Sequence, residues 1–216
     1  MSHRLVVLIS GSGTNLQAIL DAIQDGQLNA SVALVLSNKA GVAGLDRAQA
    51  AGIPTAVIEH KRFPDREQFD RAMIEAIAPY DPETVVLAGF MRILSDGFVH
   101  HYRGKLINIH PSLLPRYPGL HTHQRAIDAG DKEHGCSIHF VTEELDGGPV
   151  IAQAVVPIRS NDTAETLSKR VQLREHALYP LVLNWRAAGH VALHQDGVKL
   201  HGETLGTQGH KLEWQD

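Results

Sequence analysis

An asparagine and a histidine stand two residues apart in the segment Asn108-Ile109-His110-Pro111. An apolar run predicts a strand over residues 105–110, on which residues two apart point to the same face. Pro111 stops strand pairing and places the pair at the carboxyl end of the strand, where open α/β sheets bind their ligands. An amide donor beside an imidazole can stabilise a developing oxyanion and move a proton. The pair is therefore a candidate catalytic centre.

A second candidate lies in the acidic segment 143–148, which reads Glu-Glu-Leu-Asp-Gly-Gly. Its two glycines permit a tight loop, and the carboxylate of Asp146 would favour the protonated form of His110 if the two side chains met. Taken alone, the segment is equally typical of a solvated acidic loop. Both interpretations stay open on the sequence alone.

A third candidate is the segment 11–15, Gly-Ser-Gly-Thr-Asn, between the first predicted strand and the first predicted helix. A helix start offers unpaired N–H groups and the positive end of the helix dipole to an anion. The dinucleotide-binding fingerprint would need a glycine where the chain has Leu16, and no Gly-Lys-Ser/Thr follows that would make a nucleotide P-loop. What remains is a site for one phosphate, or a plain turn in which Thr14 or Asn15 caps the helix.

The chain has 14 histidines, and His121, His123, His134 and His139 superficially suggest metal ligands. No His-Glu-x-x-His motif and no paired cysteine spacing accompanies them, so we predict no metal site. The single cysteine, Cys136, lies inside an apolar run and is expected to be buried and unreactive. One cysteine forms no internal disulfide, which favours a cytoplasmic location.

Composition places the chain among ordinary globular proteins. Of its 216 residues, 43% are hydrophobic and 20% are charged, which is enough apolar material for a substantial core. A formal net charge of -4 argues against a nucleic-acid partner. No apolar stretch approaches the roughly 20 residues that a membrane span requires, and the first ten residues lack a secretory signal. We therefore expect neither a nucleic-acid nor a membrane partner. A monomer or a homodimer is expected, and the small-molecule partners follow from the resemblance given below.

Short apolar runs alternate with amphipathic segments through the first half of the chain. The runs predict buried parallel strands at 4–10, 31–37, 55–58, 84–88 and 105–110. The amphipathic spacing predicts helices at 15–24, 44–51 and 65–77. This alternation predicts an α/β fold, a Rossmann-like parallel sheet flanked by helices on both faces.

The last third of the chain follows a different pattern. Two longer apolar runs, 135–141 and 150–158, are joined by a short loop and predict an antiparallel extension of the sheet. A long helix follows them, and then an Asp-Gly pair at 196–197 predicts a hairpin. We expect a single domain over residues 1–203 and a loose polar tail over residues 204–216.

Several motifs together resemble the folate-dependent formyltransferases. The motif with Asn108 and His110 reads Asn-Ile-His-Pro-Ser-Leu-Leu-Pro, and Tyr-Pro-Gly at 117–119 and Asp-Gly-Gly-Pro at 146–149 follow it. Supporting segments stand at 6–11, 15–18, 87–94 and 119–123. The match covers about the first 190 residues and is highly specific, so the chain is identified as similar to this family.

The resemblance implies a reaction and the substrates that it uses. The formyl group of 10-formyltetrahydrofolate would pass to the glycinamide amine of 5-phosphoribosylglycinamide, in de novo purine biosynthesis. The formyl carrier is a co-substrate, and no metal is implied. Thr14 and Arg174 are mild departures from the family's pattern that remove no obvious chemistry.

The resemblance also assigns roles to residues of this sequence. The catalytic roles fall on Asn108, His110 and Asp146. The residues implied to bind the phosphate and the glycinamide end of the acceptor are Gly13, Thr14, Asn15, Gln172 and Glu175. The residues implied to bind the folate are Arg66, Met91, Arg92, Ile93, Leu94, Asn108, Thr142, Glu143, Glu144, Leu145 and Asp146.

Other functions are compatible with parts of this pattern. Formyltetrahydrofolate hydrolase has the same triad, but the first strand begins at Arg4 and we expect no additional N-terminal domain. Methionyl-tRNA formyltransferase adds a C-terminal domain and a basic surface, and we expect neither in this chain. A non-enzymatic phosphosugar-binding module would explain segment 11–15 but not the three polar residues of the triad.

Overall fold

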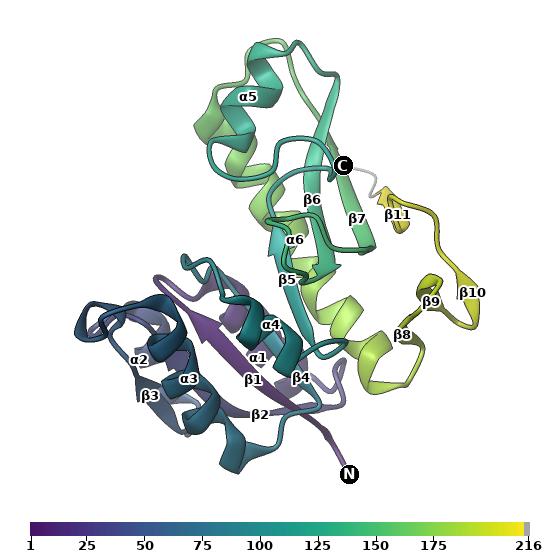
Figure 1. The fold of residues 1–216 in the computed structure, drawn as a ribbon. Coiled ribbons are helices and arrows are strands. Elements are labelled where there is room, and N and C mark those ends of the chain that lie inside the picture. Colours follow the sequence, from purple (N-terminus) through teal and green to yellow (C-terminus); the bar gives the residue numbers. More distant parts are fainter. Residues whose placement is uncertain (214–216) are drawn as a thin grey trace. The chain divides into compact units, whose positions relative to one another are not determined.

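The structure is a computed structural model that describes residues 1–213 (Figure 1). The chain folds into two compact units, the first ending at Asn108 and the second beginning at Ile109. The boundary falls inside β5 (Leu106–His110), so this one strand carries both members of the Asn108 and His110 pair.

A parallel sheet forms the centre of the first unit. Its strand order is β5, β4, β1, β2, β3, and every neighbouring pair runs in parallel. The strands other than β5 are β1 (His3–Ile9), β2 (Ala30–Ser37), β3 (Thr55–Val57) and β4 (Thr84–Leu87). Most strand residues, such as Leu5 to Ile9, are fully buried. The apolar runs of the first half are therefore confirmed as parallel strands. The prediction of burial is wrong for β3, which lies at the edge of the sheet and leaves Val57 43% exposed.

Helices cover the sheet of the first unit. They are α1 (Thr14–Gln24), α2 (Ala43–Ala50), α3 (Arg66–Ile77) and α4 (Asp96–His101), with 3₁₀ turns η1 (His60–Arg62) and η2 (Ala78–Tyr80). Helix α1 contacts α2, and α3 contacts α4. The chain runs outward from β1 to β3 and then returns to β4 and β5 on the other side of β1. Right-handed crossovers therefore place the two helix pairs on opposite faces, as predicted.

Side-chain caps set the starts of α3 and α4. The Asp65 carboxylate accepts a hydrogen bond from the Gln68 N–H at 2.7 Å, so α3 begins one residue after the predicted start. The Ser95 hydroxyl accepts the Phe98 N–H at 3.3 Å and starts α4, a short helix that the sequence pattern did not predict.

The second unit is built on an antiparallel pair. β6 (Glu133–Phe140) and β7 (Val150–Pro157) pair with Cys136 opposite Ala154, which confirms the predicted extension. Helices α5 (Thr122–Asp128) and α6 (Ala164–Ala187) contact each other, and α6 runs along β6 and β7 (Figure 1). A separate antiparallel sheet contains β8 (Val191–His194), β9 (Gly197–Leu200) and β10 (Glu203–Thr204), and it includes the predicted hairpin.

The expectation of a loose tail is wrong for residues 210–213. They form β11 (His210–Glu213), which pairs in parallel with β7 and places His210 opposite Ala152. Gly209 turns the chain into this strand at φ 66, where a Cβ would lie 2.7 Å from the backbone of Ile151. Residues 214–216 lie outside the described part of the chain. The division at residue 203 stays a prediction.

The architecture is the predicted one, a Rossmann-like α/β sheet flanked by helices with an antiparallel extension. Within residues 1–213, no helix combines the length and the apolar character that crossing a bilayer requires.

Candidate active site

His110 is buried at the end of β5, with 6% of its surface exposed. Its Nε2 lies 2.9 Å from the carbonyl oxygen of Tyr117, and its Nδ1 lies 3.5 Å from Oδ2 of Asp146. A carbonyl oxygen only accepts hydrogen bonds, so Nε2 carries a proton and donates a hydrogen bond to the Tyr117 carbonyl. Both ring nitrogens of His110 therefore face oxygen atoms.

Three groups lie beside the carboxylate of Asp146. Its Oδ2 accepts a hydrogen bond from the Gly119 N–H at 2.9 Å in addition to facing His110, and its Oδ1 lies 3.9 Å from Nε2 of His139. The backbone of Asp146 is left-handed, with φ 51, and Gly147 follows it. The structure thus brings Asp146 to His110, so this residue is not part of a fully solvated acidic loop.

His139 is a neighbour of Asp146 that the motif analysis did not include in the site. It lies on β6 with 2% of its surface exposed, and its Nδ1 donates to the carbonyl of Phe140 at 3.0 Å. Burial lowers the pKa of His139 below its ordinary value of 6.5, so the ring is neutral at pH 7. Its Nε2 then carries a lone pair and does not donate a hydrogen bond to Asp146. The position of His139 near the carboxyl end of a strand was the signal that could have identified it.

A buried hydrogen-bond network fixes the loop that follows His110. The Ser137 hydroxyl on β6 donates to the carbonyl of Ser112 at 2.7 Å and accepts the Leu114 N–H at 3.0 Å. The side-chain amide of Gln153 on β7 donates to the Leu114 carbonyl at 2.7 Å and to the Ser137 hydroxyl at 3.0 Å. Side chains of two neighbouring strands thus hold the loop that supplies the Tyr117 carbonyl.

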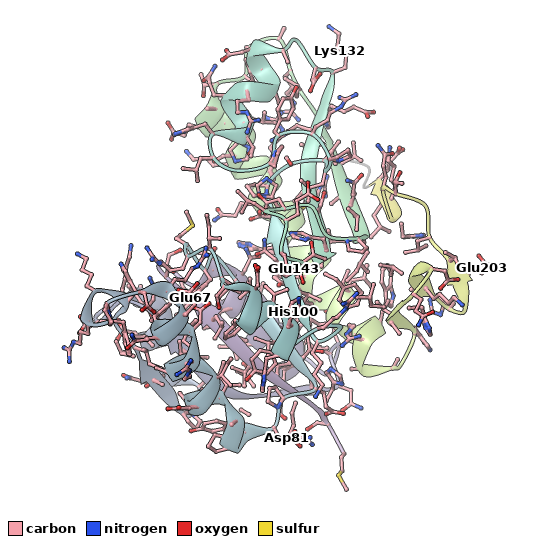
Figure 2. All side chains as sticks on the ribbon, viewed as in Figure 1. Glu67, Asp81, His100, Lys132, Glu143 and Glu203 are labelled. Carbon is pink, nitrogen blue, oxygen red and sulfur yellow. The ribbon has the colours of Figure 1, made fainter. Side chains whose placement is uncertain are left out.

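The loop after β6 carries the rest of the predicted folate residues of the second unit. Lys132 precedes β6 and Glu143 follows it, so this loop lies at the carboxyl end of the strand (Figure 2). Thr142 is half-buried, whereas Glu143, Glu144 and Leu145 are exposed. An exposed leucine between charged residues offers apolar surface to a ligand.

In the first unit, the loop between β1 and α1 borders a cavity of about 210 Å³. Its lining residues are Ser10, Gly11, Ser12, Gly13, Thr14, Asn15, Ala88, Gly89 and Met91. Gly13 caps α1 in the left-handed conformation, with φ 71, and the first turn of α1 holds no acidic residue. The predicted phosphate residues 13–15 and the first predicted folate residue, Met91, therefore share one cavity.

Of the other predicted folate residues of the first unit, Arg66 lines a second cavity. The segment 91–94 leaves Met91 and Ile93 62% and 57% exposed, while Arg92 is exposed and Leu94 is buried. Ser95 ends the segment, and its N–H donates to the buried carboxyl of Asp70 at 2.5 Å. Arg66, Asp70 and Ser95 line a cavity of about 340 Å³ between α3 and α4, so Arg66 lies beside the end of this segment.

Gln172 and Glu175 lie on α6 in the second unit, where Gln172 is exposed and Glu175 is half-buried. The charge of Glu175 acts on the fully buried thiol of Cys136, whose pKa is raised mainly by burial and further by Glu175. Glu175 therefore lies on the side of α6 near β6. The predicted burial of Cys136 is confirmed, and the raised pKa keeps its thiol protonated.

The other histidines singled out in the sequence have structural neighbours. Nδ1 of His123 lies 3.1 Å from Nε2 of His134, and burial lowers the pKa of both rings, that of His134 to about 4. Within residues 1–213, no three histidine, cysteine, aspartate or glutamate side chains gather as a metal site would require. His121 caps α5 with a left-handed backbone, at φ 57.

His110 ends one strand of a Rossmann-like sheet, and Asp146 lies in the loop after another. Polar groups at the carboxyl ends of strands are typical of the sites of α/β enzymes. The chain belongs to the formyl transferase family, whose model, described as "Formyl transferase", matches residues 3–183. This finding confirms the resemblance that the motifs carry.

Relatives within this family are similar over most of the chain. The chain is 54% identical to the phosphoribosylglycinamide formyltransferase of Escherichia coli (strain K12), over 97% of this chain and 99% of that enzyme. It is 49% identical to the trifunctional purine biosynthetic protein adenosine-3 of Bos taurus, over 90% of this chain but only 19% of that protein. A solved structure of a phosphoribosylglycinamide formyltransferase from Coxiella burnetii is 53% identical, with a TM-score of 0.94 over 98% of this chain and 99% of that one.

Proposed function

We propose that this chain transfers the formyl group of 10-formyltetrahydrofolate to the glycinamide amine of 5-phosphoribosylglycinamide, a step of de novo purine biosynthesis. The observation that carries the proposal is the buried His110, whose ring nitrogens face the Tyr117 carbonyl and the Asp146 carboxylate. This pair occurs in a member of the formyl transferase family that is 54% identical to a phosphoribosylglycinamide formyltransferase.

In the proposed mechanism the acceptor amine attacks the formyl carbon, and the carbonyl electrons move to oxygen to give a tetrahedral oxyanion. His110 donates a hydrogen bond to that oxygen, and the Asn108 amide, two residues earlier on β5, is the second donor. Asp146 stabilises the imidazolium form of His110. The oxyanion then collapses and expels the folate nitrogen, which takes up one proton while the former amine loses one.

The geometry of His110 assigns different tasks to its two nitrogens. Nδ1 faces Asp146 and keeps that partner through the reaction. Nε2 donates to the Tyr117 carbonyl, so a substrate oxygen would replace this carbonyl as the acceptor. The exchange of one oxygen acceptor for another leaves the number of hydrogen bonds unchanged, so it costs little free energy.

Substrate binding is proposed to use the two cavities of the first unit and side chains of the second. The phosphate would bind the backbone of residues 13–15 at the start of α1, where the dipole and the N–H groups favour an anion. The folate would contact segment 91–94 with Arg66, and the loop 142–146. Gln172 and Glu175 are proposed to hold the glycinamide end, with Glu175 as an acceptor for its amine.

The proposed partners are these two small molecules alone, without a nucleic acid or a membrane, and without a metal. The net charge of -4 supports the first exclusion. We further propose a cytoplasmic enzyme that works as a monomer or a homodimer.

An assay of tetrahydrofolate release tests the proposal against its alternatives. The purified chain is given 10-formyltetrahydrofolate with and without 5-phosphoribosylglycinamide. Release that requires the ribonucleotide is the expected result. Release without it would indicate a hydrolase, and binding of the ribonucleotide without release would indicate a phosphosugar-binding module.

A further inference from the structure

Two peptide groups of the loop 11–15 are tied to α2. The N–H of Gly44 donates to the carbonyl of Gly11 at 3.0 Å, and Nε of Arg47 donates to the carbonyl of Ser12 at 2.8 Å. Nη1 of Arg47 also lies 3.4 Å from the side-chain oxygen of Gln17 on α1. Arg47 thus links the loop to both helices that follow it.

These bonds fix where the opposite ends of the same peptide groups point. In a planar trans peptide the N–H points away from the carbonyl, so the N–H groups of Ser12 and Gly13 point away from α2. Within residues 1–213 neither of these two N–H groups has a hydrogen-bond partner. Both residues line the cavity of about 210 Å³ at the start of α1. The loop therefore presents two unpaired donors to that cavity.

The contact between the loop and α2 is too close to admit side chains. A Cβ on Gly13 would lie 2.6 Å from Cα of Gly44 and 3.4 Å from Cδ of Arg47. The backbone of α2 thus packs directly against the loop, and the Arg47 side chain reaches from α2 to the Ser12 carbonyl. Rotation of the Ser12 peptide would break that bond and turn the Gly13 N–H away from the cavity.

We propose that Arg47 is a positioning residue for recognition of the acceptor's 5′-phosphate. By holding the Ser12 carbonyl, it keeps the Gly13 N–H aimed at the phosphate, and its charge adds attraction for the anion. Arg47 thereby makes the enzyme select a phosphorylated acceptor over the same ribosyl glycinamide without phosphate. This inference rests on the proposed function for the identity of the acceptor.

The selection is measured as the ratio of kcat/KM for 5-phosphoribosylglycinamide to kcat/KM for the dephosphorylated riboside. In Arg47→Met we expect this ratio to fall about tenfold, because one charge-assisted hydrogen bond is worth about that factor. The KM for 10-formyltetrahydrofolate should not change. General loss of structure would lower both rates equally and leave the ratio as it is, which would contradict the proposal.

Two further variants separate positioning from charge. Arg103→Met removes an exposed arginine of the first unit that lies before β5, at the opposite end of the strands, and should leave the ratio at the wild-type value. Arg47→Lys keeps the charge but lacks the Nε donor, so its ratio should fall toward that of Arg47→Met. A wild-type ratio in Arg47→Lys would mean that charge alone acts, and would overturn the positioning role.

A binding measurement keeps this test independent of turnover. Ribose 5-phosphate is titrated into ¹⁵N-labelled protein, and the amide signals of Ser12 and Gly13 are expected to shift. Arg47→Met should weaken this binding about tenfold, whether or not formyl transfer is detected. Unchanged affinity in Arg47→Met would overturn the inference, whereas failure of the proposed function would appear as wild-type protein that binds the sugar phosphate without transferring formyl.

Discussion

The loop 11–15 and the surroundings of His110 differ in the kind of group that each offers to a ligand. The loop offers backbone N–H groups, and its glycines matter because they add no atoms where Gly13 meets Gly44. At His110 the working groups are side chains, the imidazole and the Asp146 carboxylate. A site built from backbone is damaged by adding atoms, and a site built from side chains is damaged by removing them.

The largest expected effect comes from removing a side chain at the second site. His110→Ala and Asp146→Asn should each lower kcat by about 10²- to 10⁴-fold, because a general acid and an oxyanion donor contribute on that scale. Steady-state formyl transfer and thermal unfolding, measured together, check that the loss is chemical. His100→Ala on α4 is the matched control, since His100 is exposed and is not one of the candidate site residues. Two active-site variants with nearly wild-type turnover would refute the assignment.

The next effect comes from adding atoms at the first site. Gly13→Ala should destabilise the fold by about 2–3 kcal/mol and raise the KM for the phosphorylated acceptor more than tenfold, because the left-handed backbone and the close contact both oppose a Cβ. Gly26→Ala is the control, since Gly26 has φ 73 but nothing within 4 Å of an added Cβ. The free energy of unfolding of Gly26→Ala should fall by about 1 kcal/mol, and its KM for the phosphorylated acceptor should not change. Equal KM values for the two variants would contradict the role of the loop.

A smaller effect concerns pH, and it belongs to the second unit. His134 is 1% exposed and burial lowers its pKa from 6.5 to about 4, so the unfolded chain takes up this proton at higher pH than the folded chain. The stability that neutral His134 contributes is therefore present above pH 6.5 and is lost as the pH falls toward 4, by about 2 kcal/mol between pH 6.5 and 5.

Urea denaturation at pH 7.5 and pH 5.0 measures this change. In His134→Gln the free energy of unfolding should fall less between the two pH values than in the wild type. An identical fall in both proteins would show that other groups cause it. The loop 11–15 contains no titratable side chain, so a pH effect on sugar phosphate binding must come from other residues or from the phosphate.

The smallest effect tests a side chain that has reactive chemistry but is not used. Cys136→Ala should change kcat by less than about twofold and cost about 1 kcal/mol of stability, because the thiol is buried and protonated. Iodoacetamide should label the wild-type protein only after unfolding, as mass spectrometry can measure. Rapid labelling of the native protein would contradict the burial.

Much of the fold and the centre of the site could be predicted from the sequence. Strands such as β1 and β4 are buried on both faces and appear as continuous apolar runs, and Asp65 marks the start of α3 by its capping chemistry. Asn108 and His110 were found because a strand places alternate residues on one face. The chemistry of segment 143–148 alone left the pairing of His110 with Asp146 as one of two alternatives, and the family resemblance supplied the choice between them.

What the sequence did not predict depends on partners without a side-chain pattern. The acceptor for Nε2 of His110 is a backbone carbonyl, that of Tyr117, which any residue type could supply. The donors that fix the loop 11–15 come from Gly44 and Arg47, about 30 residues further along the chain. Strand β11 has no apolar alternation, because it owes its conformation to pairing with β7.

The pairing of β11 with β7 also covers an edge of the sheet in the second unit. A sheet that ends in an unpaired strand offers a row of N–H and carbonyl groups on which a further strand can add, and aggregation begins at such rows. Residues 210–213 occupy that position on β7 and present His210, Lys211 and Glu213 at the surface, where charged groups discourage another strand from pairing. Pairing with this short polar strand therefore disfavours the addition of a further strand to β7.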